Sequence, residues 1–176
     1  DDKYPSYSLN PGLRLKLSAD ALDFFAEDGA AGIEASSRIK GVVLHDILAG
    51  VKVPSDLDGA VDAACASGNL SYDQAAHVKE LLRSRISEGE GMGWFPDDSS
   101  RVLVETDIVD VDGQVYRPDR VVMDNGKVLV IDYKSGQHHN KYERQMKMYS
   151  EIFRRMGYTD VKAVLWYLQT GEYKVI

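Results

Sequence analysis

The chain has 176 residues, of which 44% are hydrophobic, enough for one domain with an ordinary core. It has no apolar run long enough to cross a membrane, and its first residues lack the basic and then apolar pattern of an export signal, so we expect a cytoplasmic protein without membrane contacts. The single cysteine, Cys65, excludes an internal disulfide, a cysteine-based metal cage and a four-cysteine iron–sulfur cluster.

The formal net charge of −7 is unusual for a protein that binds nucleic acid, because binding to phosphates normally requires a basic face. The charge is unevenly distributed along the chain. Residues 1–100 carry 9 basic and 17 acidic groups, net −8, whereas residues 101–176 carry 12 and 11, net +1. The second part of the chain is therefore the part that tolerates a phosphate backbone.

The first half of the chain predicts an arm followed by helices. Residues 1–18 contain two prolines and a glycine and are expected to form the arm. Residues 19–87 are expected to form a helical part, because apolar residues recur there at helical spacing in four stretches. The last two stretches are separated by Gly68 and Asn69, which are typical of a helix end.

The second of these helices, over residues 36–48, carries a histidine on a face lined by small residues. His45 lies one turn from Gly41 and from Ala49, so backbone or a ligand can approach it closely. A histidine in such a helix is equally explained by a structural hydrogen bond, so its role depends on what the fold brings beside it.

Residues 87–100 are rich in glycine and acidic residues and predict a loop. Trp94 and Phe95 in this loop either fill the core or stack on a base, and we favour the core. The alternating pattern of residues 101–109 predicts the first strand of a sheet. Glu105 lies on this strand.

A predicted β-hairpin follows. Asn125 and Gly126 both tolerate a positive φ and lie between two β-rich runs, which is a strong signal of a two-residue turn. The flanking strands are predicted over residues 120–123 and 127–134.

The hairpin brings two carboxylates and an ammonium group together. Side chains alternate along a strand, so Asp132 and Lys134 share a face. Asp119, at the outer end of the first strand, folds back beside Asp132. The carboxylates suit a hard divalent cation such as Mg²⁺, and Lys134 can position a water for attack on phosphorus. A simple surface ion pair would also explain these residues.

Residues 140–156 predict an amphipathic helix that is also the most basic element of the chain. Gln145 and Tyr149 are four residues apart and share a face of this helix. Further strands over residues 161–169 and 173–176 complete an α/β fold, a mixed central β-sheet flanked by helices. The basic residues, which are the best candidates for contacts with a DNA backbone, are Lys141, Arg144, Lys147, Arg154 and Arg155.

In their order, these features resemble a nuclease family. Pro118–Asp119 followed by Asp132–Lys134 resembles the PD-(D/E)xK signature. Gly-x-x-x-His at Gly41–His45 and Gln-x-x-x-Tyr at Gln145–Tyr149 are similar to motifs of the RecB-like branch. The order of the motifs is most similar to the C-terminal nuclease domain of the AddA subunit of AddAB helicase-nucleases, and the resemblance covers about residues 38–176.

The resemblance implies a restriction-endonuclease-like core over residues 101–176, in a single nuclease domain that also contains the helical part. It implies that Asp119 and Asp132 hold a metal ion, with His45 and the carbonyl of Tyr133 as further ligands. The metal would be Mg²⁺, and the nitrogen ligand would let Mn²⁺ substitute for it.

The resemblance also assigns the remaining catalytic roles. Lys134 would handle the attacking water, while Gln145 and Tyr149 would line the DNA path near the metal. An acidic residue on the first strand often borders the site in this family. Glu105 is therefore a weaker candidate. Arg117 and Arg120 flank the first aspartate and are the weakest candidates, for clamping the phosphate or the transition state.

The function implied is a metal-dependent deoxyribonuclease, an exonuclease that forms the nuclease end of an AddAB- or RecBCD-like helicase-nuclease and processes double-strand breaks for recombinational repair. Its partners would be DNA, single-stranded at the site, the remainder of a helicase polypeptide and a partner subunit. The acidic composition suggests that most DNA affinity comes from these partners.

Two alternatives remain open from the sequence. The first is a catalytically inactive nuclease fold that serves as a DNA-binding module, although the complete set of His, Asp, Asp and Lys disfavours it. The second is a metal-dependent hydrolase with a substrate other than DNA, which the near-neutral charge of the second half permits.

Overall fold

The computed structural model describes residues 41–136 and 138–176, so the predicted arm and first helix lie outside the described residues. The helices are α2 (Gly41–Ala49), α3 (Leu57–Ala66), α4 (Tyr72–Gly91) and α5 (Asn140–Arg155), with short 3-10 helices η1 (Pro54–Asp56) and η2 (Ser99–Arg101). The strands are β1 (Val102–Val104), β2 (Ile108–Val109), β3 (Val115–Tyr116), β4 (Arg120–Asp124), β5 (Lys127–Lys134), β6 (Asp160–Tyr167) and β7 (Tyr173–Val175).

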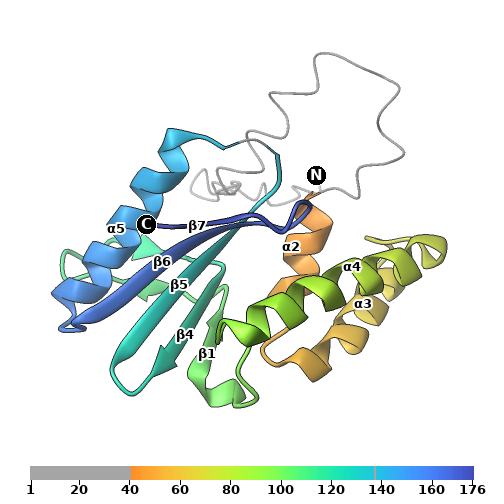
Figure 1. Cartoon of the computed structure of the whole chain (residues 1–176), viewed down its shortest axis with the longest axis horizontal. Coiled ribbons are helices and arrows are strands. Elements are labelled where there is room, and N and C mark those ends of the chain that lie inside the picture. Colours follow the sequence, from red (N-terminus) through yellow and green to blue (C-terminus); the bar gives the residue numbers. More distant parts are fainter. Residues whose placement is uncertain (1–40, 137) are drawn as a thin grey trace, which may run out of the picture. The chain divides into compact units, whose positions relative to one another are not determined.

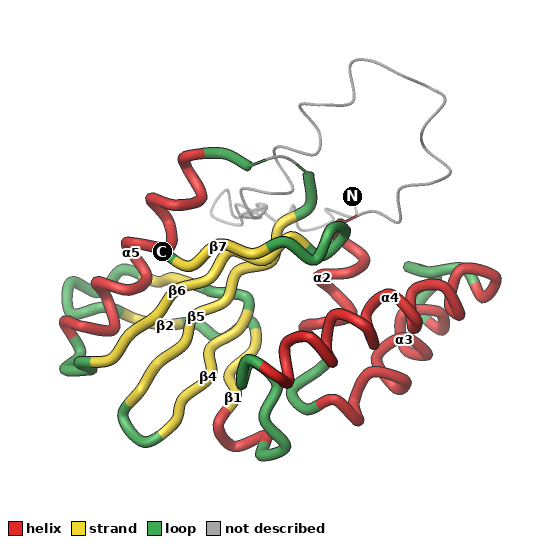
Figure 2. The backbone as a smooth tube through the Cα atoms, viewed as in Figure 1, coloured by secondary structure: helices red, strands yellow, loops and turns green. Residues whose placement is uncertain are grey.

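The main sheet has five strands in the order β1-β4-β5-β6-β7. Strands β5 and β6 are parallel, because the chain crosses between them through α5, and all other neighbours are antiparallel. Strands β2 and β3 form a separate two-stranded hairpin. The predicted mixed α/β sheet is therefore confirmed, and the path of the chain through it can be followed in Figure 2.

The sheet is covered by helices on both faces. On one face, α2, α3 and α4 pack over alternate residues of the central strands, including Ile131 and Trp166. On the other face, α5 packs over the residues between them, including Val130 and Leu165. The two helical layers are seen on either side of the strands in Figure 1. Both cores are thus built from the two-residue periodicity of β5 and β6.

The hairpin predicted at Asn125 and Gly126 is confirmed. Both residues have a positive φ, 47° and 82° respectively, as a tight turn between right-twisted strands requires. Asp124 pairs with Lys127 directly beside this turn, and the ladder continues down the two strands. The turn therefore sets the register of the whole β4–β5 pair.

The predicted strand over residues 101–109 is wrong in its middle. It is broken into β1 and β2 at Glu105, which adopts a positive φ of 45°. The Glu105 amide still donates a hydrogen bond of 3.1 Å to the carbonyl of Asp119, the residue opposite it in the register of β1 and β4. A left-handed conformation is uncommon for a residue with a side chain, so this turn is a local constraint on the backbone.

The predicted loop over residues 87–100 begins later than expected, since α4 continues to Gly91. Gly89 is buried, and a Cβ there would lie 2.8 Å from the ring of Phe95. The amide of Trp94 donates to the carbonyl of Gly89 at 2.8 Å. Trp94 and Phe95 are buried in the core, which confirms the favoured interpretation of these aromatics.

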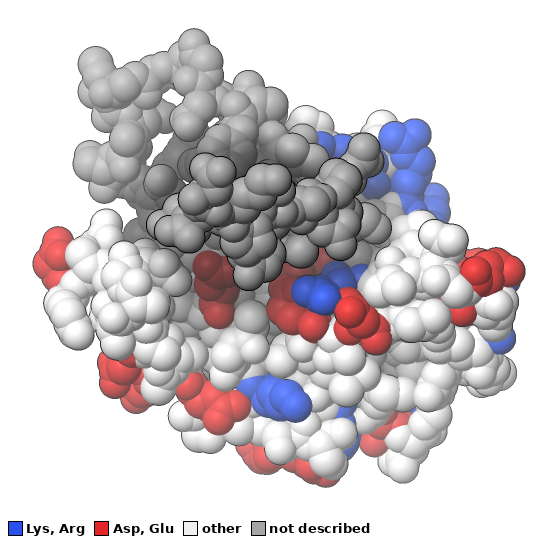
Figure 3. All heavy atoms as spheres, turned by 180° about the vertical axis from the view of Figure 1, so that it is seen from behind, with Lys and Arg blue, Asp and Glu red and all other residues white. Residues whose placement is uncertain are grey.

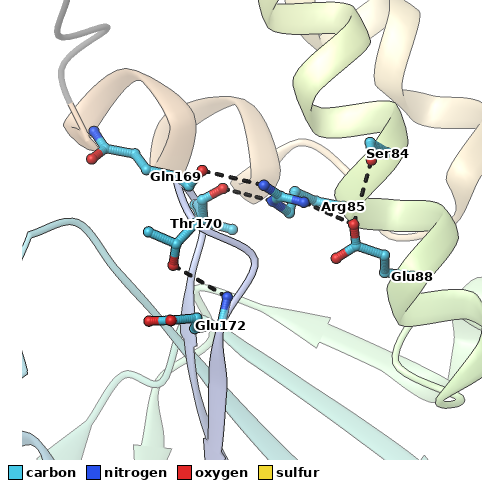
Figure 4. A network of polar contacts seen from close by, with 7 residues as sticks. Ser84, Arg85, Glu88, Gln169, Thr170 and Glu172 are labelled. Carbon is cyan, nitrogen blue, oxygen red and sulfur yellow. Dashed lines mark hydrogen bonds and ion pairs between the residues drawn. The ribbon is translucent and has the colours of Figure 1, made fainter.

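An arginine on α4 ties the helical layer to the turn between β6 and β7 (Figure 4). Arg85 donates to the carbonyls of Leu168 at 2.8 Å and Gln169 at 3.2 Å, and pairs with Glu88 at 2.8 Å. A Cβ on Gly171 would lie 2.7 Å from the guanidinium, so a glycine in this turn lets the arginine reach the backbone.

The first residue of α2 lies directly against the end of β5. A Cβ added to Gly41 would clash with Oγ and Cβ of Ser135, the residue that follows Lys134. The Ser135 Cβ cannot rotate away, so any larger residue at position 41 must displace backbone. The glycine of the Gly-x-x-x-His motif is therefore needed for close contact between helix and strand.

We predict that Gly41→Ala destabilises the protein by about 1–3 kcal/mol, because the added methyl group overpacks the contact between α2 and β5. Gly59→Ala in α3 is the matched control, since a Cβ there meets nothing within 4 Å. Alanine is a better helix former than glycine, so the control should be neutral or stabilising by about 0.5–1 kcal/mol. Urea unfolding measures both, and equal effects of the two substitutions would contradict the close-contact explanation.

Candidate active site

The candidate active site lies at the end of the main sheet where β5 stops and β4 begins. Asp119 directly precedes β4, and the pairing of Arg120 with Ile131 leaves it opposite Asp132. Asp132 and Lys134 lie two residues apart on the face covered by α5. The structure thus brings together the two predicted carboxylates and the lysine, as the hairpin geometry predicted.

Lys134 and Asp132 form a buried ion pair. The Lys134 Nζ lies 2.6 Å from Oδ2 of Asp132, and the two side chains are 2% and 4% exposed. The ammonium group also lies 4.3 Å from the centre of the Tyr142 ring on α5. An ion pair shielded from water to this degree creates a strong local field, unlike the solvated surface pair considered as the alternative.

The Asp119 carboxylate is held by backbone and approached by a histidine. It accepts a hydrogen bond of 2.6 Å from the Tyr133 amide, and its Oδ2 lies 3.7 Å from Nδ1 of His45. Burial raises the pKa of Asp119 well above its usual range, and the neighbouring charge of Asp132 raises it further. The Tyr133 amide and Lys134 act in the opposite direction but do not cancel these effects.

A third carboxylate joins this group. Glu105 is an exposed residue whose carboxyl lies beside Asp119, and desolvation of this carboxyl raises its pKa. The contact with Asp119 and the charge of Arg117 lower the pKa, while the charges of Asp132 and Asp46 raise it. Two carboxylates in contact need a shared proton or a cation between them. Glu105, expected to be a peripheral candidate, is therefore part of the acidic cluster.

His45 reaches the site from the opposite face of the sheet. Its helix, α2, belongs to the same core cluster as the Tyr133 side chain. The edges of the His45 and Tyr133 rings meet in a T-shaped contact with 5.6 Å between the ring centres. Tyr133 thus contacts groups of the site on both faces of the sheet. Its ring packs against His45, and its amide donates to Asp119.

Helix α5 brings Gln145 and Tyr149 to the other side of the cluster. Gln145 Nε2 donates a hydrogen bond of 3.1 Å to the Tyr149 hydroxyl. Tyr149 is 5% exposed, and burial followed by the charge of Asp132 raises its pKa above that of a free tyrosine. The hydroxyl therefore stays protonated at neutral pH and lies near the carboxylates, while its ring packs against Tyr116.

The two arginines beside Asp119 have different surroundings. Arg117 is exposed and pairs with Asp107 at 2.7 Å. Arg120 is fully buried, and its guanidinium donates to three backbone carbonyls. The predicted contact of Arg120 with phosphate is therefore wrong, because the side chain is fully buried and each of its three nitrogens donates to a backbone carbonyl.

The side chains at this site are of the types that bind a divalent cation, although they do not converge on a single point. Among residues 41–136 and 138–176, no three side chains of His, Cys, Asp or Glu are arranged to hold a metal ion. The chemistry of these side chains nevertheless suits a cation. Three carboxylates lie close together, and the pKa is raised at two of them. A bound cation would offset the repulsion among them. The group that could hold the cation consists of His45, Glu105, Asp119, Asp132 and the carbonyl of Tyr133.

Fold and site together define a class of protein. A mixed sheet with helices on both faces, and an Asp-Asp-Lys group at the end of a β-hairpin, is the arrangement of a restriction-endonuclease-like phosphodiesterase. The sequence model of the PD-(D/E)XK nuclease superfamily matches residues 17–175 of the chain. The protein therefore belongs to the PD-(D/E)XK nuclease superfamily, whose members generally use divalent metal ions.

Other comparisons add little. No curated protein is significantly similar to the chain. A solved structure described as the crystal structure of SSO0001 is 16% identical, covers 81% of this chain and 71% of its own, and superposes with a TM-score of 0.33. So low a score is not a basis for comparing the two sites. No helix within the described part of the chain is long and apolar enough to span a membrane.

We predict that Asp119→Asn stabilises the metal-free protein more at about pH 8 than at about pH 5. The raised pKa means that the folded state holds the Asp119 proton to higher pH than the unfolded state, so Asp119 destabilises the fold increasingly as pH rises above about 4. Each unit of pKa difference corresponds to about 1.4 kcal/mol. An asparagine oxygen can still accept from the Tyr133 amide.

Urea unfolding in EDTA at the two pH values measures this effect. Asp124→Asn, an exposed carboxylate paired with Arg101 at the far end of the hairpin, is the control and should show no such gain. A stabilisation by Asp119→Asn that was larger at the lower pH would contradict the assigned electrostatics.

Proposed function

We propose that this protein is a metal-dependent deoxyribonuclease whose active site is the cluster at the end of β4 and β5. The observation that supports this most directly is the convergence of Asp119, Asp132 and Lys134 in a shielded site of a chain from a nuclease superfamily. Asp119 and Asp132, together with His45 and the carbonyl of Tyr133, would hold Mg²⁺, with Mn²⁺ able to substitute. A bound cation would stabilise the negative charge that develops on the phosphate.

In this proposal the protein's own groups orient the reactants. Lys134, anchored by Asp132, positions the water that attacks phosphorus. As the new P–O bond forms, the attacking water gives up a proton to the solvent, the bond to the leaving sugar oxygen breaks, and that oxygen takes up a proton from the solvent. The protonated Tyr149 hydroxyl, oriented by Gln145, is a neutral donor beside the carboxylates and can hydrogen-bond to a phosphate or sugar oxygen.

We further propose that the domain is the nuclease end of an AddAB-like helicase-nuclease that processes double-strand breaks in the cytoplasm. The order of the motifs supports this, as does the net charge of −7, which leaves most DNA affinity to a helicase region and a partner subunit. Such a protein would receive a single strand at the site and act as an exonuclease.

Helix α5 is proposed to guide the strand. Arg144, Lys147 and Arg154 are exposed and carry no ion pair within the described residues. In the view from behind, a group of basic side chains lies at the upper right, on the side of the molecule where α5 lies, while acidic ones are scattered over the face (Figure 3). Gln145, next to Arg144 in sequence, links this basic surface to the site.

The proposal predicts that the protein cuts linear single-stranded DNA with Mg²⁺ or Mn²⁺ and not with EDTA. Lys134→Ala and Asp119→Ala should each lower the rate by about 100-fold or more, because they remove the group that positions the water or a carboxylate of the metal site. Digestion of an end-labelled oligonucleotide gives the rates.

Lys79→Ala is the matched control for a lost lysine, since this side chain pairs with Asp58 and Asp62 between α3 and α4. It should cut like the parent. Equal cutting by the parent, Lys134→Ala and Asp119→Ala would disprove the assignment, and binding of DNA without cutting would favour the inactive binding module.

We also predict that Arg144→Glu weakens binding of a dye-labelled single strand in EDTA and lowers the salt dependence of binding by about one unit of slope, because one phosphate contact is lost. Arg83→Glu changes the net charge equally but lies on α4, where it is paired with Asp58, and should bind nearly as the parent does. Fluorescence anisotropy over a range of salt concentrations distinguishes the two. Equal weakening by both variants would indicate a general charge effect without a path along α5.

A further inference from the structure

A buried arginine joins three separate segments directly behind the candidate active site. Arg120, the first residue of β4, is fully buried, and its guanidinium lies 3.9 Å from the centre of the Phe95 ring. It donates hydrogen bonds to the carbonyls of Val51 at 2.8 Å, Lys52 at 2.6 Å and Trp94 at 2.8 Å. These short, charge-assisted contacts fix the other two segments, at Val51–Lys52 and Trp94–Phe95, relative to β4.

Two of these carbonyls belong to the chain that leaves α2. The helix ends at Ala49, and the amides of Gly50 and Val51 are still bonded to carbonyls of its last turn. Val51 is itself fully buried. Arg120 therefore holds the C-terminal end of the helix that carries His45.

A second contact holds the same helix one turn before His45. Gly41 packs against Ser135, immediately after Lys134. Helix α2 is thus fixed at its C-terminal end to β4, beside Asp119, and at Gly41 to the end of β5. His45 lies between these two anchors, 3.7 Å from Asp119.

From this arrangement we infer that Arg120 is a positioning residue that sets the distance between His45 and Asp119, and so the affinity of the site for a divalent cation. The inference rests on the proposed function, because it assumes that a cation binds between these residues. Arg120 and Asp119 are adjacent in the chain, so a shift of the α2 end relative to β4 alters the separation of the two ligands directly.

A purely structural role for Arg120 makes a different prediction. Loss of the guanidinium would then lower stability, but the remaining folded protein would bind the cation as the parent does. Arg85 provides the comparison, because it is also a largely buried arginine that donates to two backbone carbonyls. Its contacts lie at the turn between β6 and β7 and do not hold α2 (Figure 4).

The test compares Arg120→Met with Arg85→Met in the whole chain. Mn²⁺ binding without DNA is followed by electron paramagnetic resonance, and stability by thermal unfolding in EDTA. Both substitutions are expected to lower the unfolding temperature. Only Arg120→Met is expected to weaken Mn²⁺ binding, by about 10-fold or more, as is typical when a residue that orients metal ligands is lost.

Cleavage at several metal concentrations provides a second readout. For Arg120→Met, the Mn²⁺ concentration for half-maximal cutting should rise, while the rate at saturating Mn²⁺ should fall less. If Arg120→Met does not fold, Arg120→Lys is compared with Arg85→Lys. Lysine keeps the charge but cannot reach three carbonyls, so weaker Mn²⁺ binding by the Arg120 variant alone is again expected.

Unchanged Mn²⁺ affinity in a folded Arg120 variant, with parent-like half-saturation, would overturn the inference and leave the proposed function intact. An equal loss of affinity in the Arg85 variant would overturn it as well, because the effect would then follow stability alone. Failure of the parent to bind Mn²⁺, or binding that persists in Asp119→Ala, would instead overturn the metal site proposed here and the inference with it.

Discussion

The register of the β4–β5 hairpin is the constraint on which the rest of the site depends. Side chains alternate between the two faces of a strand, so a shift of one residue in this pairing would move Asp132 and Lys134 to the face covered by α2–α4. The turn at Asn125 and Gly126 prevents this shift. Its two positive φ angles make a two-residue turn, which fixes the pairing of Asp124 with Lys127 beside it. The geometry of the candidate active site is therefore set by a turn at the other end of the strands.

The sequence was sufficient to predict the parts of this arrangement that follow from local rules. The hairpin, the helix over Asn140–Arg155 and the convergence of Asp119 with Asp132 each rest on spacing within a short segment. The mixed sheet also followed, because a strand, a helix and another strand in succession favour a parallel pair. The predicted roles of His45, Gln145 and Tyr149 came from a family resemblance, and the structure places all three side chains near the carboxylates.

What the sequence could not predict depends on contacts between distant segments. Glu105 ends its strand in a left-handed turn beside Asp119, and no pattern within residues 101–109 signals that turn. Arg120 lies beside Asp119 in a basic and acidic stretch, which suggested a phosphate contact. Its acceptors at Val51 and Trp94 are far away in the chain, so its burial becomes visible only when the three segments are assembled.

The unequal lengths of the strands have a consequence for how the protein behaves at high concentration. The outermost strands, β1 and β7, have three residues each, whereas β5 and β6 in the interior have eight. The unpaired edge of a strand is where a separate copy of the protein can add by β-sheet hydrogen bonding, which leads to aggregation. In this protein the edge strands are short. The part of β6 that does not pair with β7 carries the charged residues Asp160 and Lys162. The fold therefore leaves little apolar strand edge open to neighbouring molecules.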